Sequence, residues 1–318
     1  YAYEAIADMK VDSKNGIWFT GRTFGDFPTT SNAIYNVNRG SYDAILFKLN
    51  SNGQLVFSTH WGFEWDDIAE GIAIDSYDNV YISGYTNSTQ FQTTNHSAQK
   101  VNAGGYDAFL FKMNADYTAS MTILFGGNNN DYGSNLTIDS KNNLYMGGYT
   151  NSSNLLTNSN SYQTKLNGNT DAFLVKISPQ GNILWNTYLG GLGNKGDIGI
   201  MDQCGDVECN SNDEVVIAAR TTSSNFPVTS DALQKNNNGG SHDSFYSIFS
   251  KDGELVYSSY LGGTGTDFLL DIVWDKNDDL VLAGHTTSSN FPIIGNSYQK
   301  QLKNRDAFLL KFGKAKPV

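Results

Sequence analysis

The chain carries one segment five times, and this internal repeat constrains its fold more than any other feature. The segment YDAILFKLN, beginning at Tyr42, recurs as YDAFLFKMN, TDAFLVKIS, HDSFYSIFS and RDAFLLKFG. Successive copies of its aspartate are separated by 64, 64, 72 and 63 residues. A second segment, of which IDSYDNVYISGYT is one copy, recurs in step with the first. Two anchors that keep register along the whole chain predict a repeat architecture. The aspartates are Asp43, Asp107, Asp171, Asp243 and Asp306, and the threonines that end the second anchor are Thr23, Thr86, Thr150, Thr221 and Thr286.

Each repeat contains four short strand-like runs, which we label A, B, C and D in chain order. In the second repeat they are residues 70–75, 79–86, 107–113 and 121–125. Tight turns rich in Asn, Asp, Ser and Gly join A to B and C to D. The runs are apolar on both faces, which indicates a sheet that is covered on both sides. Four short antiparallel strands at fixed spacing are typical of a propeller blade.

The fold prediction is an all-β, five-bladed β-propeller of four-stranded antiparallel blades, with about 64 residues per repeat. We predict a single domain over residues 1–318, with repeats at approximately 1–63, 64–127, 128–191, 192–263 and 264–318. The last blade lacks its own outer strand, because no D run follows its C run. It is either three-stranded or completed by residues upstream of Tyr1.

Two further features recur with the repeat, the first in all five copies and the second, a loop glutamine, in the second to fifth. Run B carries a small residue at one register, which we expect to allow neighbouring blades to pack closely. A loop of about 20 residues joins B to C and contains a repeated glutamine eight residues after an aromatic residue or leucine. We therefore expect these loops to be ordered and packed on the blade through that residue. The small residues are Gly21, Gly84, Gly148, Ala219 and Gly284, and the glutamines are Gln99, Gln163, Gln234 and Gln299.

These spaced anchors, from GIAIDSYDNVYISGYT to DAFLFK in the second repeat, resemble the bacterial β-propeller repeat called SBBP, which is related to NHL-type repeats. The resemblance covers nearly the whole chain. It implies a large secreted or surface-attached bacterial protein in which this segment adjoins other domains. The family name implies seven blades, whereas this sequence holds five repeats.

Composition excludes several classes of partner. A net charge of −11 argues against nucleic acid, because phosphate backbones are bound by basic surfaces. No apolar run approaches the roughly 18–20 residues that span a bilayer, so we expect no membrane insertion.

Two rows of acidic residues recur with the repeat. One is the aspartate that opens run C, and the other opens run A and includes Asp67, Asp131, Asp202 and Asp267. We expect the A row to line the rim of a central channel, where carboxylates are candidate ligands for Ca²⁺. The alternative is that each aspartate accepts hydrogen bonds from its own loop, as a feature present in every repeat suggests. No cofactor is certain, and Ca²⁺ is the one candidate. The lysines of run C, Lys48, Lys112, Lys176 and Lys311, are expected at a blade rim with buried stems.

The fourth repeat departs from the pattern. Residues 193–209 contain about seven extra residues, and Ile248 replaces the lysine of run C. The cysteines of the chain, Cys204 and Cys209, are a candidate disulfide if the compartment is oxidising. The acidic residues Asp197, Asp206 and Glu208 are candidates for a partner-binding surface. The alternative is a surface loop closed by the disulfide.

No enzyme signature is present, and the four histidines show no metal-ligand spacing. The expected function is a non-catalytic extracellular binding or scaffolding propeller of a bacterial secreted or cell-surface protein, such as an adhesin. It would contact protein or glycan partners through the face that carries the B–C loops. One alternative is a carbohydrate-active enzyme with its site in the central funnel. Another is a subunit of a surface filament, joined by strand exchange at the incomplete blade.

Overall fold

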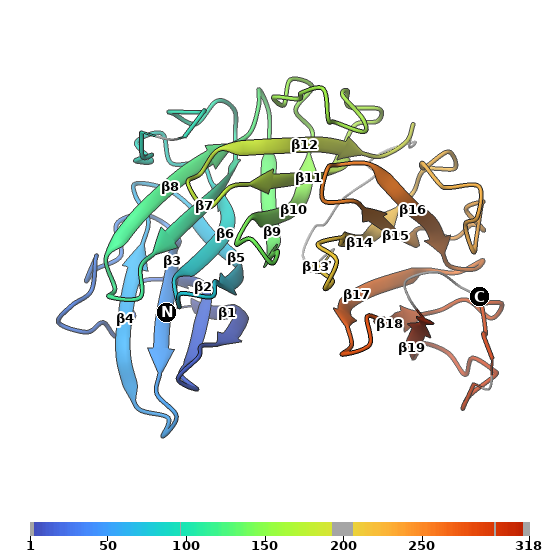
Figure 1. Ribbon diagram of the computed structural model, residues 1–318, viewed down its shortest axis with the longest axis horizontal. Coiled ribbons are helices and arrows are strands. Elements are labelled where there is room, and N and C mark those ends of the chain that lie inside the picture. The colour runs from blue at the N-terminus through green and yellow to red at the C-terminus, as the bar shows by residue number, and fades with distance from the viewer. Residues whose placement is uncertain (1–2, 96, 193–205, 296, 314–318) are drawn as a thin grey trace. The chain divides into compact units, whose positions relative to one another are not determined.

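The computed structural model describes residues 3–95, 97–192, 206–295 and 297–313, and these residues are all β, with no α-helix (Figure 1). Nineteen described strands form five antiparallel sheets. The chain divides into two compact units, which are described separately. The first comprises Tyr1–Met146, Ser152–Leu156 and Lys176–Leu184, and the second comprises Gly147–Asn151, Thr157–Val175 and Trp185–Val318.

The first compact unit contains two complete sheets, each formed by consecutive strands in the order A-B-C-D. A third sheet of the same order is divided between the two compact units. The first sheet comprises β1 (Tyr3–Val11), β2 (Ile17–Phe24), β3 (Asp43–Leu49) and β4 (Leu55–Trp61). The second comprises β5 (Asp67–Ile74), β6 (Val80–Thr86), β7 (Asp107–Met113) and β8 (Ala119–Phe125). The third comprises β9 (Asp131–Ile138), β10 (Leu144–Thr150), β11 (Asp171–Ile177) and β12 (Ile183–Leu189).

The second compact unit contains one four-stranded and one three-stranded sheet. In the fifth sheet, no described strand pairs with the outer edge of its last strand. The fourth sheet comprises β13 (Asp206–Cys209), β14 (Val215–Thr221), β15 (Asp243–Phe249) and β16 (Leu255–Leu261). The fifth comprises β17 (Asp267–Trp274), β18 (Leu280–Thr286) and β19 (Asp306–Phe312).

The A–B turns share one backbone conformation, which explains their repeated Asn and Asp residues. Asp75 Oδ1 accepts hydrogen bonds from the N–H groups of Tyr77 and Asn79, both at 2.9 Å. Asp78, between them, has a positive φ of 62°. Asn and Asp tolerate this left-handed conformation better than other residues with a Cβ. The equivalent residues with positive φ are Asn15, Asn142, Asp213 and Asp278.

A bulge in strand A explains the repeated small residue of strand B. The β5–β6 register shifts between Ala69 and Gly71, so Glu70 is an extra residue. A Cβ on Gly84 would collide with the carbonyl of Ile68 in the same sheet. The same collision arises at Gly21 and Gly284. The nearest neighbour of this position thus belongs to the glycine's own sheet, and the Gly84 carbonyl also lies close to Gly133 of the next sheet.

Burial is greatest in the middle strands and where sheets of one compact unit pack together. Strand β7 is buried along nearly its whole length. In the first compact unit, Trp61 and Phe111, from the first and second sheets, have ring centroids 4.0 Å apart. In the second, Tyr246 and Phe312, from the fourth and fifth sheets, are stacked at 5.6 Å. Burial on both faces is the pattern predicted for blade strands.

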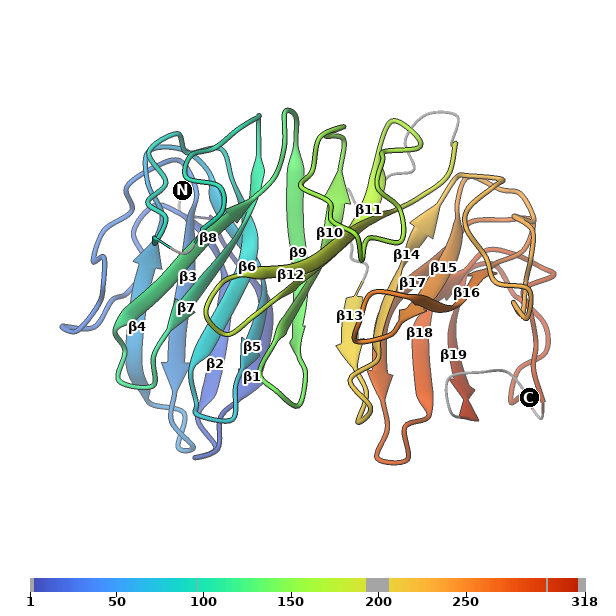
Figure 2. The same ribbon diagram turned by 45° about the horizontal axis from the view of Figure 1, so that its top comes forward.

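The predicted elements of the second repeat agree closely with the structure. Its C strand has the predicted bounds, and its A strand begins three residues earlier than predicted, at Asp67. The long β6–β7 loop lies at the opposite end of its sheet from the β5–β6 and β7–β8 turns (Figure 2). The all-β fold with repeated antiparallel sheets is confirmed, and closure of five blades as one domain stays a prediction.

Candidate functional site

The A-row aspartate of the second repeat is a buried hydrogen-bond acceptor. Asp67 is fully buried at the start of β5. Its Oδ1 accepts a hydrogen bond from Thr86 Oγ1 at 2.5 Å. Its Oδ2 accepts from the Phe63 N–H at 2.7 Å and from Ser88 Oγ at 3.0 Å. These donors lie at the end of strand B and in the connections on either side, so the carboxylate fastens two loops to one strand.

Asp131 and Asp267 are also fully buried and repeat this arrangement. Asp131 accepts hydrogen bonds from the Gly127 N–H and from Ser152 Oγ, both at 2.7 Å. Asp267 accepts them from the Gly263 N–H at 2.7 Å and from Ser288 Oγ at 2.6 Å. These three carboxylates are therefore buried and not exposed, and their position at the rim of a central channel stays a prediction. Asp202 lies outside the described residues. Within the described ranges, no group of three or more His, Cys, Asp or Glu side chains is arranged to hold a metal ion.

The C-row aspartates hold the B–C loops. Asp243 Oδ2 accepts hydrogen bonds from the Asn238 N–H at 2.8 Å and from Gln234 Nε2 at 3.4 Å. A loop N–H donates in the same way in every repeat, at 2.7–2.9 Å. The repeated glutamine also donates to the repeated aspartate in the second to fifth repeats. The repeated aspartate of run C and the repeated glutamine of the B–C loop are therefore hydrogen-bond partners in the structure.

Carboxylates of the two rows approach each other at the connection between consecutive sheets. Asp43 and Asp67 both lie against Gly62, where a Cβ would collide with both side chains. Burial raises the pKa of Asp43 to about 7; the Arg39 N–H opposes this shift and the Asp67 carboxylate adds to it. Burial also raises the pKa of Asp67 to about 6, although the hydrogen bonds that its carboxylate accepts lower the pKa.

The same pairing occurs at two other connections. Asp107 pairs with Asp131 at Gly126, and Asp243 pairs with Asp267 at Gly262. Burial and the neighbouring carboxylate raise the pKa of Asp107 to about 6 and that of Asp243 to about 7. The Oδ1 atoms of Asp43, Asp107 and Asp243 are buried and accept no hydrogen bond. These carboxyl groups therefore take up protons close to neutral pH.

The first repeat replaces the glutamine partner with a histidine. His60 is fully buried in β4, with Nδ1 3.8 Å from Asp43 Oδ2. Neither ring nitrogen makes a hydrogen bond of ordinary geometry, and burial lowers the pKa of His60. His60 occupies the strand position held by Tyr260 in the fourth sheet. Among the described residues, no hydroxyl or thiol bonds to the imidazole.

The strand-C lysines form ion pairs with the A–B turns, a contact that the sequence reasoning missed. Lys176 is nearly buried, with Nζ 3.1 Å from Asp139 Oδ2. The fourth repeat has Asn210 in place of the aspartate and Ile248 in place of the lysine. Simultaneous loss of both partners was the signal that could have revealed the pair. The equivalent pairs are Lys48–Asp12 at 2.6 Å and Lys311–Asp275 at 2.6 Å, and Lys112 lies over the Tyr81 ring at 5.1 Å.

The described partner-surface candidates belong to a strand. Asp206 and Glu208 lie in β13, beside the fifth sheet. Asp206 Oδ2 accepts a hydrogen bond from the Ile272 N–H at 3.3 Å, and the Glu208 carbonyl accepts one from Trp274 Nε1 at 3.2 Å. These two residues therefore lie in a strand, and their part in a partner-binding surface stays a prediction. Asp197 and Cys204 lie outside the described residues, so the disulfide between Cys204 and Cys209 stays a prediction.

The B–C loops are ordered as predicted, and in the first four sheets they bind the D strand of their own sheet. Phe226, in the fourth loop, is buried against Phe245 with ring centroids 4.0 Å apart. The Thr229 N–H donates to the Ser258 carbonyl at 3.0 Å. In the second repeat the equivalent bond, from Thr94 to Thr122, measures 2.8 Å. The loops therefore form a second layer outside the D strands.

These loops and the D–A connections meet at the same end of each sheet. In the first repeat the Ser41 N–H donates to the Trp65 carbonyl at 3.0 Å. Large apolar side chains are exposed there despite the ordered backbone, and Trp65 is 56% exposed. The others are Val37, Val101 and Leu156 in the first compact unit, and Tyr162, Ile293 and Tyr298 in the second.

No helix in the described part of the chain has the length and apolarity needed to cross a membrane. No curated protein matches the chain. A crystal structure of a protein of unknown function from Bacteroides caccae is similar at 10% identity, with a TM-score of 0.40, over 77% of this chain and 63% of that one. A second similar structure is described as the extracellular domain of a hybrid two-component system from B. thetaiotaomicron. Here the identity is 11% and the TM-score 0.35, over 95% of this chain and 35% of that one. The chain thus spans less than two thirds of the length of either.

A family model identifies the repeat itself. The model SBBP, described as a beta-propeller repeat, matches residues 57–92 and 122–155. Each match runs from strand D through the A–B hairpin of the next sheet, and includes the glycine that opens the connection and the paired aspartate and threonine. Residues 57–92 and 122–155 are thus SBBP β-propeller repeats, as the resemblance in the sequence implied.

Proposed function

We propose that this chain is a five-bladed β-propeller that works as a non-catalytic binding or scaffolding module of a secreted or cell-surface bacterial protein. It contacts protein or glycan partners through the end of the sheets that carries the B–C loops and D–A connections. The match to SBBP repeats supports the propeller and, through the usual setting of that family, the extracellular location.

The observation that carries this proposal is the exposure of apolar side chains on ordered loops. Trp65 and Tyr298 are 56% and 106% exposed. Hydrogen bonds to the carboxylates of Asp67 and Asp306 tie these two loops down, so little conformational entropy is lost when a partner binds. Exposed aromatic side chains on a rigid frame are common anchors for protein and sugar ligands.

The non-catalytic assignment is proposed because the repeated carboxylates are buried and accept structural hydrogen bonds. Asp67 and Asp243 accept hydrogen bonds from the backbone and from neighbouring side chains, and equivalents occur in other repeats. A general acid or a nucleophile needs access to substrate, whereas these groups are fully buried.

A glycan array and an array of immobilised host-surface proteins, each probed with labelled protein, test the proposal. We expect binding that Trp65→Ser weakens at least about tenfold, as is usual for an aromatic anchor. Tyr77→Ser is the matched control, because Tyr77 is 73% exposed in the A–B turn at the opposite end of its sheet. Hydrolysis of any polysaccharide in a parallel turnover screen would contradict the non-catalytic assignment.

Closure of the propeller has its own test. A compact chain of 318 residues has a radius of gyration of about 20 Å. Small-angle X-ray scattering should give this value for a closed ring, and a clearly larger one if the two compact units are separate bodies.

A subunit joined to others by strand exchange is a second candidate function. It is favoured by one observation, that no described strand pairs with the outer edge of β19 in the fifth sheet.

A further inference from the structure

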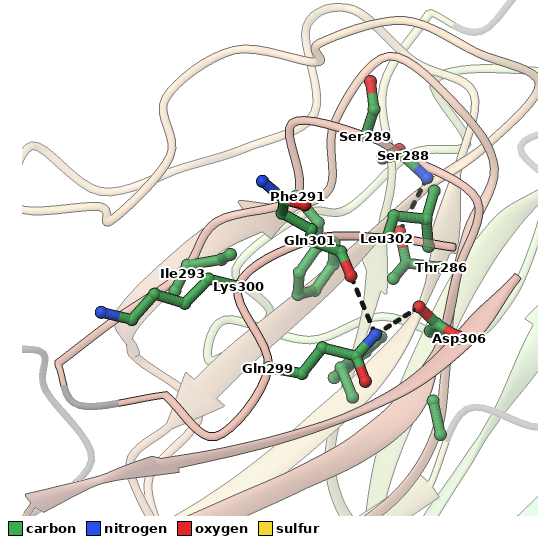
Figure 3. Close-up of a pocket in the computed structure, with 12 residues that line it drawn as sticks. Thr286, Ser288, Ser289, Phe291, Ile293, Gln299, Lys300, Gln301, Leu302 and Asp306 are labelled. Atoms are coloured by element: carbon green, nitrogen blue, oxygen red, sulfur yellow. Dashed lines mark hydrogen bonds between the residues drawn. The ribbon is translucent and has the colours of Figure 1, made fainter. Parts of the chain in front are cut away.

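Two residues at the loop end of each sheet belong to the frame that holds the B–C loop, the threonine that ends strand B and the aspartate that opens strand C. In the fifth repeat, Asp306 accepts a hydrogen bond from Gln299 Nε2 at 2.6 Å (Figure 3). Thr286 Oγ1 accepts one from the N–H two residues later, at 2.9 Å. The second repeat forms the same bonds at Thr86 and Asp107. The pocket in Figure 3 is lined by such frame residues and belongs to the attachment of the loop.

The residues immediately before this threonine and this aspartate are not fixed by the frame, because their chemistry changes from repeat to repeat. With the exception of Thr170, all of them are tyrosine, histidine or arginine. A third such position follows the A-row aspartate and holds Ile68, Tyr132 and Phe268 in the second, third and fifth repeats. Variable side chains on a rigid, repeated backbone are where a ligand-specific site can arise. The residues before the threonine are Arg22, Tyr85, Tyr149, Arg220 and His285, and those before the aspartate are Tyr42, Tyr106, Thr170, His242 and Arg305.

At the boundary between the second and third sheets, these positions bring three tyrosines together. The Tyr85 ring lies edge-on to Tyr106 and Tyr132, with ring centroids 5.5 and 4.9 Å away. Tyr106 and Tyr132 have centroids 5.2 Å apart and ring planes inclined by 29°. All three side chains are half-buried, and all belong to the first compact unit. Tyr85, Tyr106 and Tyr132, which we call the tyrosine cluster, thus present partly exposed aromatic surface at the loop end of the sheet.

The same three positions converge at the boundary between the fourth and fifth sheets, in the second compact unit. The guanidinium carbon of Arg220 lies 4.8 Å from the centroid of the Phe268 ring. The His242 and Phe268 rings have centroids 5.8 Å apart. Convergence of these positions is therefore a property of the repeated fold, whereas three tyrosines in them are particular to one boundary.

Three charged side chains surround the tyrosine cluster. Glu70, the extra residue of the β5 bulge, has Oε1 3.1 Å from the Arg22 guanidinium, and both side chains are 26% exposed. Burial raises the pKa of the Tyr85 hydroxyl, and the Glu70 carboxylate adds to this shift while Arg22 opposes it. On the other side, Asp66 Oδ2 accepts a hydrogen bond from the Tyr106 hydroxyl at 2.8 Å. Aromatic rings and planar, hydrogen-bonding charges therefore lie side by side.

This arrangement does not suit a charged ligand. An ammonium ion held by aromatic rings lies over their faces, within about 6 Å of each centroid, so the rings of such a cage stand apart. The rings of the tyrosine cluster instead contact one another. An anion would meet the Glu70 and Asp66 carboxylates, with the Arg22 guanidinium as the opposing charge.

An uncharged sugar fits the same groups. The C–H face of a pyranose ring is apolar and packs on the ring of a tyrosine, whose hydroxyl stays available to polar partners. Carboxylates accept hydrogen bonds from sugar hydroxyls, and a guanidinium has five N–H donors to offer to their oxygens. Glu70 and Asp66 supply the acceptors here and Arg22 supplies the donors.

We propose that the tyrosine cluster, together with Arg22, Asp66 and Glu70, binds an uncharged pyranose unit of a glycan. The sugar packs a C–H face on the tyrosine rings, and its hydroxyls bond to the three charged side chains. The inference rests on the proposed binding function and deepens it, because it names a neutral sugar as the partner and gives the sugar a place in the first compact unit.

Isothermal titration calorimetry of the whole chain with neutral tetrasaccharides tests the proposal. The probes are linear tetramers of glucose, mannose, galactose and xylose, and tetragalacturonate is the charged comparator. We expect saturable binding of at least one neutral probe, with a Kd at or below about 1 mM. Tetragalacturonate should bind more weakly, because Glu70 and Asp66 repel its carboxylates. Absence of saturation with every neutral tetramer, or a preference for tetragalacturonate or for a trimethyl-lysine peptide, would overturn the inference.

Variants of the protein locate the contact. Tyr106→Ala should weaken binding of the neutral probe at least about tenfold, whereas Tyr106→Phe keeps the ring and should stay closer to the parent. Glu70→Gln removes a charged acceptor and should weaken binding about threefold or more. Circular dichroism checks folding, and Glu70→Gln decides the outcome if Tyr106→Ala does not fold. Tyr77→Ala, at the opposite end of the sheet, is the control, and equal affinity of Tyr106→Ala and Tyr77→Ala would contradict the site.

This inference and the proposed function can fail separately. Binding of a host-surface protein that depends on Trp65, without binding of any neutral tetrasaccharide, would overturn the sugar site and support the proposed function. Sugar binding that depends on Tyr106, accompanied by hydrolysis of the probe, would support the site and contradict the non-catalytic assignment alone.

Discussion

Pairs of buried carboxylates recur at the described connections between sheets, although burying like charges is unfavourable. At the connection between β16 and β17, Asp243 and Asp267 both lie against Gly262. Burial and the second carboxylate raise the pKa of Asp243 to about 7, well above the value of about 3.9 in an unfolded chain. The folded state therefore holds a proton that the unfolded state releases. Its contribution to stability is complete below about pH 4 and is lost as the pH rises through about 7.

Asp243→Asn should therefore stabilise the protein relative to the parent, and increasingly so from pH 5 to pH 8. The amide is neutral at every pH, and its oxygen can accept the bonds from Asn238 and Gln234. We expect a gain of about 1–2 kcal/mol at pH 8, or a few degrees in Tm, measured by thermal unfolding at several pH values. Asp252→Asn, at an exposed turn, is the matched control and should change Tm equally at all pH values. A difference in Tm between Asp243→Asn and the parent that does not grow with pH would contradict the raised pKa of Asp243.

The ion pair between strand C and the A–B turn makes a second prediction at this scale. Lys176→Ile should destabilise the protein by about 2–4 kcal/mol, because it leaves the buried Asp139 carboxylate without its cation. The double variant Asp139→Asn/Lys176→Ile should recover much of this loss. Asn210 and Ile248 already occupy these places in the fourth repeat, where Asn210 Oδ1 accepts the same turn bonds at 3.0 and 2.9 Å. A double-mutant cycle from urea unfolding measures the coupling, and additive effects would show that the pair contributes nothing.

Among the elements, the B–C loop forms an additional layer on the sheets. It lies outside strand D, bonds to that strand's backbone and holds the C-row aspartate through a glutamine. The loop's internal repeat made its order predictable from sequence. Its attachment to strand D was not predictable, because the contact depends on backbone groups that every residue possesses.

Gln234→Ala should release the fourth loop without unfolding the sheets. It removes two donor bonds and the bond accepted from Gly262, so residues 222–242 should become the preferred site of limited proteolysis. The loss of global stability should be about 1–3 kcal/mol. The neighbouring Lys235→Ala is the control, and cleavage at the same rate in both variants would show that the glutamine does not hold the loop.

The strands and turns were predictable because the repeat displays each element several times. The A-strand bulge was not, because its extra residues are Ala7, Glu70 and Leu270, which share no chemistry. The glycine opposite the bulge was visible in the sequence, but its cause was visible only in the structure. The acidic rows were found, and their alternative role as hydrogen-bond acceptors is the one that the described residues display.

For the molecule as a whole, the repeated polar network buries the A-row carboxylates of Asp67, Asp131 and Asp267, so these three are not available to an ion. Millimolar CaCl₂ should therefore leave Tm within about 1 °C of its value in EDTA, since a ligand stabilises only the state that it binds. Differential scanning fluorimetry measures this directly. A rise of several degrees that Asp67→Asn or Asp267→Asn abolishes would restore the calcium hypothesis.

The central claim is that the fifth sheet repeats the others except for an open outer edge. Hydrogen–deuterium exchange resolved along the chain tests it most directly, because β15 and β19 are equivalent strands in one sample. We predict that the amides of Ala307, Leu309 and Lys311 exchange about 100-fold faster than those of Ser244, Tyr246 and Ile248. Equal protection of β15 and β19 in the free chain would contradict the account.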